Sequence, residues 1–227
     1  RIDIFDQWLN IPLVNIVFVA FCLLVLKNGS NFMDGINGLT IGYFLLIFLI
    51  IFFNLNHLEY DEVLIENLIL ILIFILILNL KGLLFLGDSG SYTIGLFTGI
   101  FLIDFAFNNS SISPYFVILL LWYPCFELLF SMLRRYFREK KTYNPDTKHL
   151  HQIIYKYLKD TINTNNNLLL HVLTALLINF YNLISFIFAL RYIYNSEKLI
   201  LITIFNITIY ILTYKYLNFS FNRIKRK

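Results

Sequence analysis

Side chains that suit metal and phosphate chemistry recur in three short segments, each beside a long apolar run. The first, NFMDGINGL, carries Asn31, Asp34 and Asn37 at a spacing of three. On a helix this spacing places them near one face, whereas Gly35 and Gly38 allow tight turns. A carboxylate flanked by amides suits a hard cation, and amides also donate to a base edge. The alternative is a turn with helix caps, which the same residue types favour.

The second segment, FLGDSGSYTIG, places Asp88 among small residues just before a new apolar run. Asp88 is a candidate Mg²⁺ ligand, because Mg²⁺ in proteins takes one or two carboxylates and leaves other positions for water and substrate phosphate. Free N–H groups at the positive end of the following helix also favour phosphate. The alternative is that Asp88 or Ser91 caps that helix.

The third segment, NPDTKHLHQ, contains Asp146, Lys148, His149 and His151. A transition-metal site is disfavoured, because no third His or Cys ligand accompanies the pair. Lysine and protonatable imidazole both donate to phosphate oxygens, so we interpret the segment as one that holds a diphosphate. A solvated basic loop is the alternative.

The composition around these segments is that of a membrane protein. Hydrophobic residues make up 59% of the 227 residues and charged residues 14%, against about 25% charged in soluble domains. A bilayer core about 30 Å thick asks for about 20 apolar residues per helix. We therefore predict an all-α polytopic bundle, a single membrane domain over 1–227. About seven stretches approach the required length: 11–26, 39–55, 63–80, 92–107, 113–133, 168–190 and 199–217.

Charge sets the predicted orientation. Threading seven helices places residues 27–38, 81–91, 134–167 and 218–227 on one side, and that side holds 15 of the 18 Lys and Arg residues when Lys215 is counted with it. The positive-inside bias makes this side cytoplasmic, so we predict a multi-pass inner-membrane protein. Its three polar segments then share the cytoplasmic face, the third within a loop over 134–167. Basic residues directly after apolar helices favour topology signals and anionic lipid over nucleic acid.

Glu127 and Asp104 are acidic residues within apolar runs. Glu127 is two helical turns from Arg134 and near the predicted cytoplasmic edge. Although intramembrane carboxylates are often functional, we interpret Glu127 as a snorkelling, paired structural residue. Asp104, near the outer end of its helix, is interpreted as interfacial.

Taken in order, the segments NFMDGINGL, GDSGS and HLH resemble the polyprenyl-phosphate N-acetylhexosamine-1-phosphate transferases, the WecA/MraY-like group. The resemblance covers nearly the whole chain. It implies transfer of a sugar 1-phosphate from a UDP-N-acetyl sugar to a polyprenyl phosphate such as undecaprenyl phosphate, with release of UMP. In relatives this step starts a cell-envelope polysaccharide of the O-antigen, teichoic acid or peptidoglycan type.

The resemblance also implies roles for single residues. Asp88 is the principal ligand of Mg²⁺, with Mn²⁺ as an alternative, and Asn31 lies beside it. Asp34 positions or activates the attacking lipid phosphate. Two residues are assigned to the nucleobase: Asn37 faces the uracil and Phe85 stacks on it. His149 and His151, preceded by Lys148, contact the diphosphate and sugar.

Two departures from the family pattern stand out. An earlier Asp-Asp motif of relatives has no counterpart here, since residues 1–10 offer only Asp3 and Asp6; we therefore expect an N-terminally truncated member, equivalent to the C-terminal two-thirds of the fold. HLHQ also stands where relatives often continue with a further His. The alternatives are a transporter or flippase, or an inactive fragment. The sequence leaves open which UDP-sugar is used, which pathway the product enters, whether the transfer is direct or passes through a covalent intermediate, and whether the protein is a homodimer.

Overall fold

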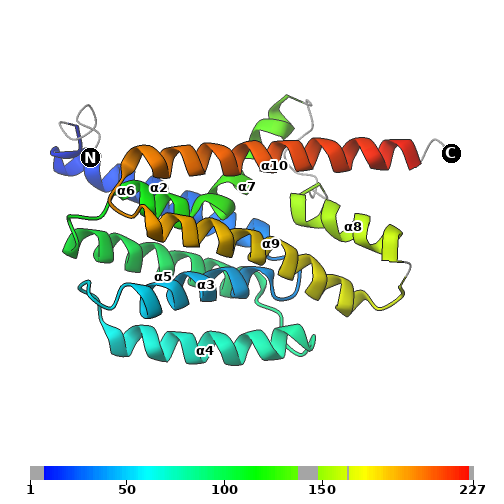
Figure 1. Ribbon diagram of the computed structural model, residues 1–227, viewed down its shortest axis with the longest axis horizontal. Helices are drawn as coiled ribbons and strands as arrows, with labels where there is room; N and C mark the ends of the chain where they lie inside the picture. Colours follow the sequence, from blue (N-terminus) through cyan, green and yellow to red (C-terminus); the bar gives the residue numbers. More distant parts are fainter. Residues whose placement is uncertain (1–7, 138–147, 163, 225–227) are drawn as a thin grey trace.

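The computed structural model describes residues 8–137, 148–162 and 164–224, and no β-strand occurs among them. The helices are α2 (Pro12–Met33), α3 (Leu39–Asn54), α4 (Glu62–Leu80), α5 (Gly87–Asn108), α6 (Pro114–Leu120), α7 (Trp122–Tyr136), α8 (Leu150–Ile162), α9 (Asn167–Arg191) and α10 (Ser196–Ile224). Most run along the long axis of the molecule (Figure 1). The prediction of an all-α fold is confirmed.

The connections divide between the two ends of the bundle. The α2–α3 and α4–α5 connections and helix α8 lie toward the end where the chain terminates (Figure 1). The α3–α4, α5–α6 and α9–α10 connections lie at the other end. The stretch 134–167, predicted as a loop, contains the end of α7 and all of α8. The elements that carry the three polar segments therefore lie toward one end.

The predicted count of seven membrane spans is not confirmed. Among the residues that the structure describes, five helices are long and apolar enough to cross a bilayer, namely α2, α4, α5, α9 and α10. A sixth span results if α6 and α7 are counted together. Helix α3 is apolar but has only 16 residues. It packs against α4, α5 and α9, and its apolar surface on all sides is typical of a helix enclosed by others.

The predicted span 113–133 is broken at Leu121, where α6 and α7 meet at an angle of 69°. Pro124 has no N–H to donate to the carbonyl of Leu120, four residues earlier, and prolines break helices in this way. The buried hydroxyl of Tyr43 donates to that carbonyl instead, at 2.7 Å. Helix α3 thus supplies the hydrogen bond that the proline removes.

Helix α2 packs closely against α5 and α7 through small residues. A Cβ at Gly29 would overlap the backbone carbonyl of Pro124, and a Cβ at Gly95 would overlap the side chain of Ser30. Small residues let helix backbones approach in this way in membrane proteins. The C-terminal end of α2, which carries the first polar segment, is thereby held against two other helices.

We expect Gly29→Ala to destabilise the protein by about 1–3 kcal/mol, because the backbone of Pro124 cannot rotate away from the added methyl group. Thermal unfolding of the detergent-solubilised protein measures the change. Gly90→Ala is the matched control, since the added methyl group there meets only the side chain of Leu86, at 3.0 Å or more. Equal losses in the two variants would contradict close α2–α7 packing as the cause.

Candidate functional site

The first two polar segments are joined by the side chain of Asn31. Its Oδ1 accepts a hydrogen bond from Ser91 Oγ at 3.0 Å, and its Nδ2 donates to the Tyr92 hydroxyl at 3.1 Å. Ser91 is fully buried. The predicted alternative of an N-cap at Asp88 or Ser91 is wrong, because α5 begins at Gly87 without a side-chain cap. Ser91 instead connects the second segment to the first.

Asp34 ends α2 and faces the start of α5. Burial raises the pKa of its carboxyl group to about 6, the Gly87 backbone N–H opposes that rise, and the negative charge of Asp88 adds to it. Asp88 itself is exposed in the first turn of α5. Two carboxylates that are 54 positions apart in the sequence therefore interact at one end of the bundle.

This donor set fits a hard divalent cation. Within the part of the chain that the structure describes, no three His, Cys, Asp or Glu side chains gather as a metal site. The oxygens available are the carboxylates of Asp34 and Asp88 and the amide oxygen of Asn31. Burial is the main cause of the raised pKa of Asp34, and the negative charge of Asp88 adds to it. Mg²⁺ suits such a site, because it binds through one or two carboxylates and keeps several waters.

The third segment lies against the first. The backbone of Gly35 approaches His151, so that a Cβ there would lie 3.2 Å from His151 Nε2. Phe32 meets the ring of His149 edge-on, with centroids 5.1 Å apart. The two histidine rings stack with an interplanar angle of 5°. All three polar segments therefore meet, while Asp146 lies outside the described residues.

His151 is buried and electrically neutral near pH 7. Burial lowers the pKa of its imidazole to about 4, with Glu127 opposing this shift and His149 adding to it. Within the described residues, neither of its ring nitrogens has a hydrogen-bond partner. Buried polar atoms are nearly always paired in folded proteins, so this ring is suited to a polar ligand, to which it offers one donor and one acceptor.

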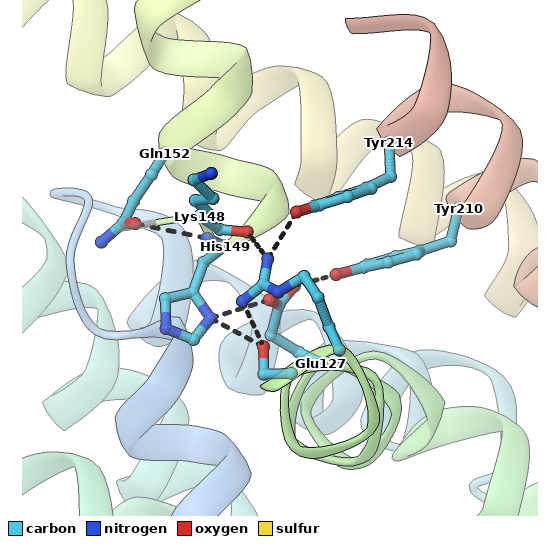
Figure 2. Close-up of polar contacts among 8 residues, drawn as sticks. Glu127, Lys148, His149, Gln152, Tyr210 and Tyr214 are labelled. Carbon is cyan, nitrogen blue, oxygen red and sulfur yellow. Dashed lines mark hydrogen bonds and ion pairs between the residues drawn. The ribbon is translucent and has the colours of Figure 1, made fainter. Parts of the chain in front are cut away.

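Helices α7 and α10 hold the start of α8. Ser131 Oγ lies 3.3 Å from His149 Nδ1. Arg134 donates to the backbone carbonyl of Lys148 and, at 2.6 Å, to the Tyr214 hydroxyl. Figure 2 shows Lys148 and His149 at this place, with Tyr214 beside them. Lys148 is thus placed directly before α8, as part of the same end of the bundle.

The prediction that Glu127 snorkels to the membrane surface is wrong. Its side chain has no exposed surface, and its Oε1 lies 2.9 Å from His149 Nδ1. Tyr210 donates to the other carboxylate oxygen at 2.7 Å. A carboxylate four residues before Ser131 and seven before Arg134 on one helix was a visible signal of a polar face. The histidine partner was not visible, because it lies on a separate segment.

The two residues predicted to contact the uracil lie on different connections between helices. Asn37, on the α2–α3 turn, is buried, and its backbone N–H donates to His171 Nδ1 of α9 at 3.2 Å. Phe85, on the α4–α5 connection, is 72% exposed. The structure links these connections through Asn79. This buried side chain accepts from the Gly38 N–H at 2.6 Å and donates to the Leu84 carbonyl at 2.8 Å.

Sequence reasoning missed Asn79 and His171. Asn79 is an amide that follows a run of eleven apolar residues near the end of α4, which is a signal that it has a partner within the protein. Its partners could not be inferred, since one of them is the backbone of Gly38 on another helix. The Asn79 side chain holds the residues that adjoin Asn37 and Phe85.

A polytopic helical membrane protein with acidic, amide and imidazole groups at one end of its bundle is the class that this fold and site define. Residues 2–106 match the family model of glycosyl transferase family 4. This match supports the assignment to this family that the motifs indicated. The match includes the first two polar segments and ends before the third. No curated protein and no solved structure matched the chain.

The family gives the general activity. Its members are glycosyl-phosphate transferases of the membrane, which use a sugar-nucleotide donor and a lipid-phosphate acceptor. The apolar helices agree with such a multi-pass membrane enzyme.

We expect Asp34→Asn to raise the melting temperature of the chelator-treated protein at pH 7.5. Because the folded-state pKa of Asp34 is raised to about 6 from 3.8, the folded protein binds this proton more tightly than the unfolded chain, and stability falls as pH rises through this interval. The amide removes that loss. The gain should be smaller at pH 4.5, where folded wild-type Asp34 is protonated, and should approach zero only below pH 3.8, where the carboxyl group of the unfolded chain is protonated as well.

The exposed Asp104→Asn variant is the control for this comparison, and it should leave the melting temperature nearly unchanged at both pH values. A gain for Asp34→Asn that is the same at both pH values would contradict the electrostatic cause.

Proposed function

We propose that this chain transfers a sugar 1-phosphate from a UDP-N-acetyl sugar to a polyprenyl phosphate, such as undecaprenyl phosphate, with release of UMP. The observation that supports this most is the meeting of Asn31, Asp34, Asp88 and the two motif histidines at one end of an apolar helical bundle. A water-soluble nucleotide sugar and a bilayer-dissolved lipid can bring their phosphates together only at such an end.

The reaction forms a bond between a lipid-phosphate oxygen and the sugar-bearing phosphorus. The bond from that phosphorus to the bridging oxygen breaks, and this oxygen leaves with UMP. Asp88 and Asn31 would hold Mg²⁺, which supplies charge neutralisation for the two anionic substrates. Asp34, with a pKa near physiological pH, is suited to accept a proton from the lipid phosphate or to position it.

The imidazoles complete the phosphate site in this proposal. His149 and His151 sit against the first segment and would contact the diphosphate and sugar from the side of α8. Lys148 precedes them and adds positive charge. His151, being neutral, donates one hydrogen bond and accepts another, which suits a sugar hydroxyl as well as a phosphate oxygen.

The nucleotide would lie over the two connections that Asn79 joins. Asn37 would pair with the uracil edge and Phe85 would stack on its face. The large exposed fraction of Phe85 supports this assignment, because a stacking platform needs an accessible ring.

Orientation and localisation follow from charge. The positive-inside bias favours the cytoplasmic side of the inner membrane for the end that carries the motifs. The donor UDP-sugar would then be taken from the cytoplasm, at the start of a cell-envelope polysaccharide.

Membranes that contain this protein should release UMP from a UDP-N-acetyl sugar when undecaprenyl phosphate and Mg²⁺ are present. We expect Asp88→Asn to lower this rate by about 100-fold, the equivalent of about 2.7 kcal/mol of transition-state stabilisation. Asp104→Asn is the matched control, because it makes the same change on the same helix at the opposite end, where the side chain is exposed. Equal rates for the wild type and Asp88→Asn would refute the proposed metal site.

We expect Asn79→Leu to raise the KM for the UDP-sugar by about fivefold or more, because two hydrogen bonds that hold the nucleotide platform are lost. Asn67→Leu is the control on the same helix, since the Asn67 amide is exposed and donates only to its own helix. Steady-state UMP release at varied UDP-sugar concentration measures both. Equal KM values for the two variants would contradict a role of Asn79 in holding the nucleotide platform.

A further inference from the structure

Glu127 is the buried ionisable residue that the proposed function leaves without a role. It lies within α7, is fully buried, and has both carboxylate oxygens engaged. Oε1 is 2.9 Å from His149 Nδ1, and Oε2 accepts from the Tyr210 hydroxyl at 2.7 Å. Figure 2 shows the carboxylate between the histidine and the tyrosine.

These contacts determine where one proton lies. An ionised carboxylate has only acceptor oxygens, so the hydrogen between Oε1 and His149 must reside on Nδ1. With Nδ1 directed at Glu127, any contact between the His149 ring and a substrate is made through Nε2. The pairing of a ligating histidine with a carboxylate behind it works in the same way at metal sites, where it sets tautomer and ring orientation.

The ring is also held on its flanks. Phe32 packs against it edge-on and His151 stacks on it. Phe32 directly follows Asn31, which the proposed function places at the metal. The orientation of His149 is therefore linked to the segment that carries Asn31 and Asp34.

A folding role alone explains Glu127 poorly. Removing a carboxylate from water costs free energy that hydrogen bonds and nearby positive charge must offset. Well-packed apolar side chains often stabilise a fold as well as a buried ion pair does. The presence of a carboxylate at this buried position therefore indicates a function that depends on its charge and its acceptor oxygens.

We infer that Glu127 is the positioning residue for His149: it fixes a proton on Nδ1 and aims Nε2 at the phosphate groups of the substrate. The inference rests on the proposed function for what Nε2 meets. The carboxylate also stabilises positive charge on the ring when Nε2 donates to a phosphate oxygen. Glu127 itself touches no substrate and acts through the imidazole.

The first test reads the His149 proton directly and needs no turnover. Nitrogen-15 NMR of histidine-labelled protein in detergent, with His149 assigned by His149→Gln, should show a hydrogen-bonded Nδ1–H in the wild type. Glu127→Met removes the acceptor at similar volume, and this signal should be lost. Asn206→Met is the matched control, because this buried amide of α10 bonds Ser185 and Tyr181 and should leave the signal in place.

The second test is a double-mutant comparison of UMP release. We expect Glu127→Met to lower kcat by about 10- to 100-fold, while the KM for the UDP-sugar changes little. In the His149→Gln background the same substitution should cost no more than about twofold, because the group through which it acts is already gone. Glu127→Gln, which keeps an acceptor but lacks the charge, should retain the Nδ1–H signal and still lose rate; it serves if the Met variant does not fold.

The outcomes separate the two proposals. An unchanged Nδ1–H signal in Glu127→Met, or losses that multiply in the double variant, would overturn the role of Glu127. Absence of UMP release by the wild type would overturn the proposed function, and the NMR comparison alone would then decide whether Glu127 orients His149.

Discussion

Within an apolar bundle, each polar group that leaves water must find its partner inside the protein, and this constraint explains most of what is specific in the structure. The carbonyl of Leu120, released by Pro124, accepts from Tyr43. The Gly38 N–H finds the amide of Asn79. Each pairing joins two separate helices. The polar residues that look isolated in the sequence thereby become the links that hold the helix ends in register.

Helix α2 is the element on which the site depends. Its close packing against α7 at Gly29 and against α5 at Gly95 brings its C-terminal end to the start of α5. Asn31 then reaches Ser91, and Phe32 reaches His149. Small residues where α2 packs against α5 and α7 therefore decide the geometry of the polar residues at the end of α2.

Burial shifts the pKa values of an acidic and a basic group of the site in opposite directions. Asp34 is half-buried beside a second carboxylate, so its proton is held more tightly than usual. His151 is fully buried and loses its proton more easily. The acidic side of the site is thus prepared for a cation, and the imidazole side presents a neutral ring next to one that is paired with a carboxylate. This asymmetry suits the proposed reaction between two phosphate-bearing substrates, in which a metal ion would neutralise phosphate charge.

The sequence alone predicted the all-helical membrane class, the resemblance to the glycosyl transferase family and the candidate site residues, because composition and motif order are properties of the chain alone. Local patterns could not show that 113–133 is broken or that α3 is short and enclosed. They misplaced Glu127 and suggested caps at Asp88 and Ser91, since a cap and a cross-helix hydrogen bond use the same residue types. Only the tertiary structure decided the partners: His149 for Glu127, Ser91 for Asn31, and Gly38 and Leu84 for Asn79. The physical reason is that hydropathy and spacing report on neighbours within one helix, whereas these partners come from segments that meet only when the helices pack.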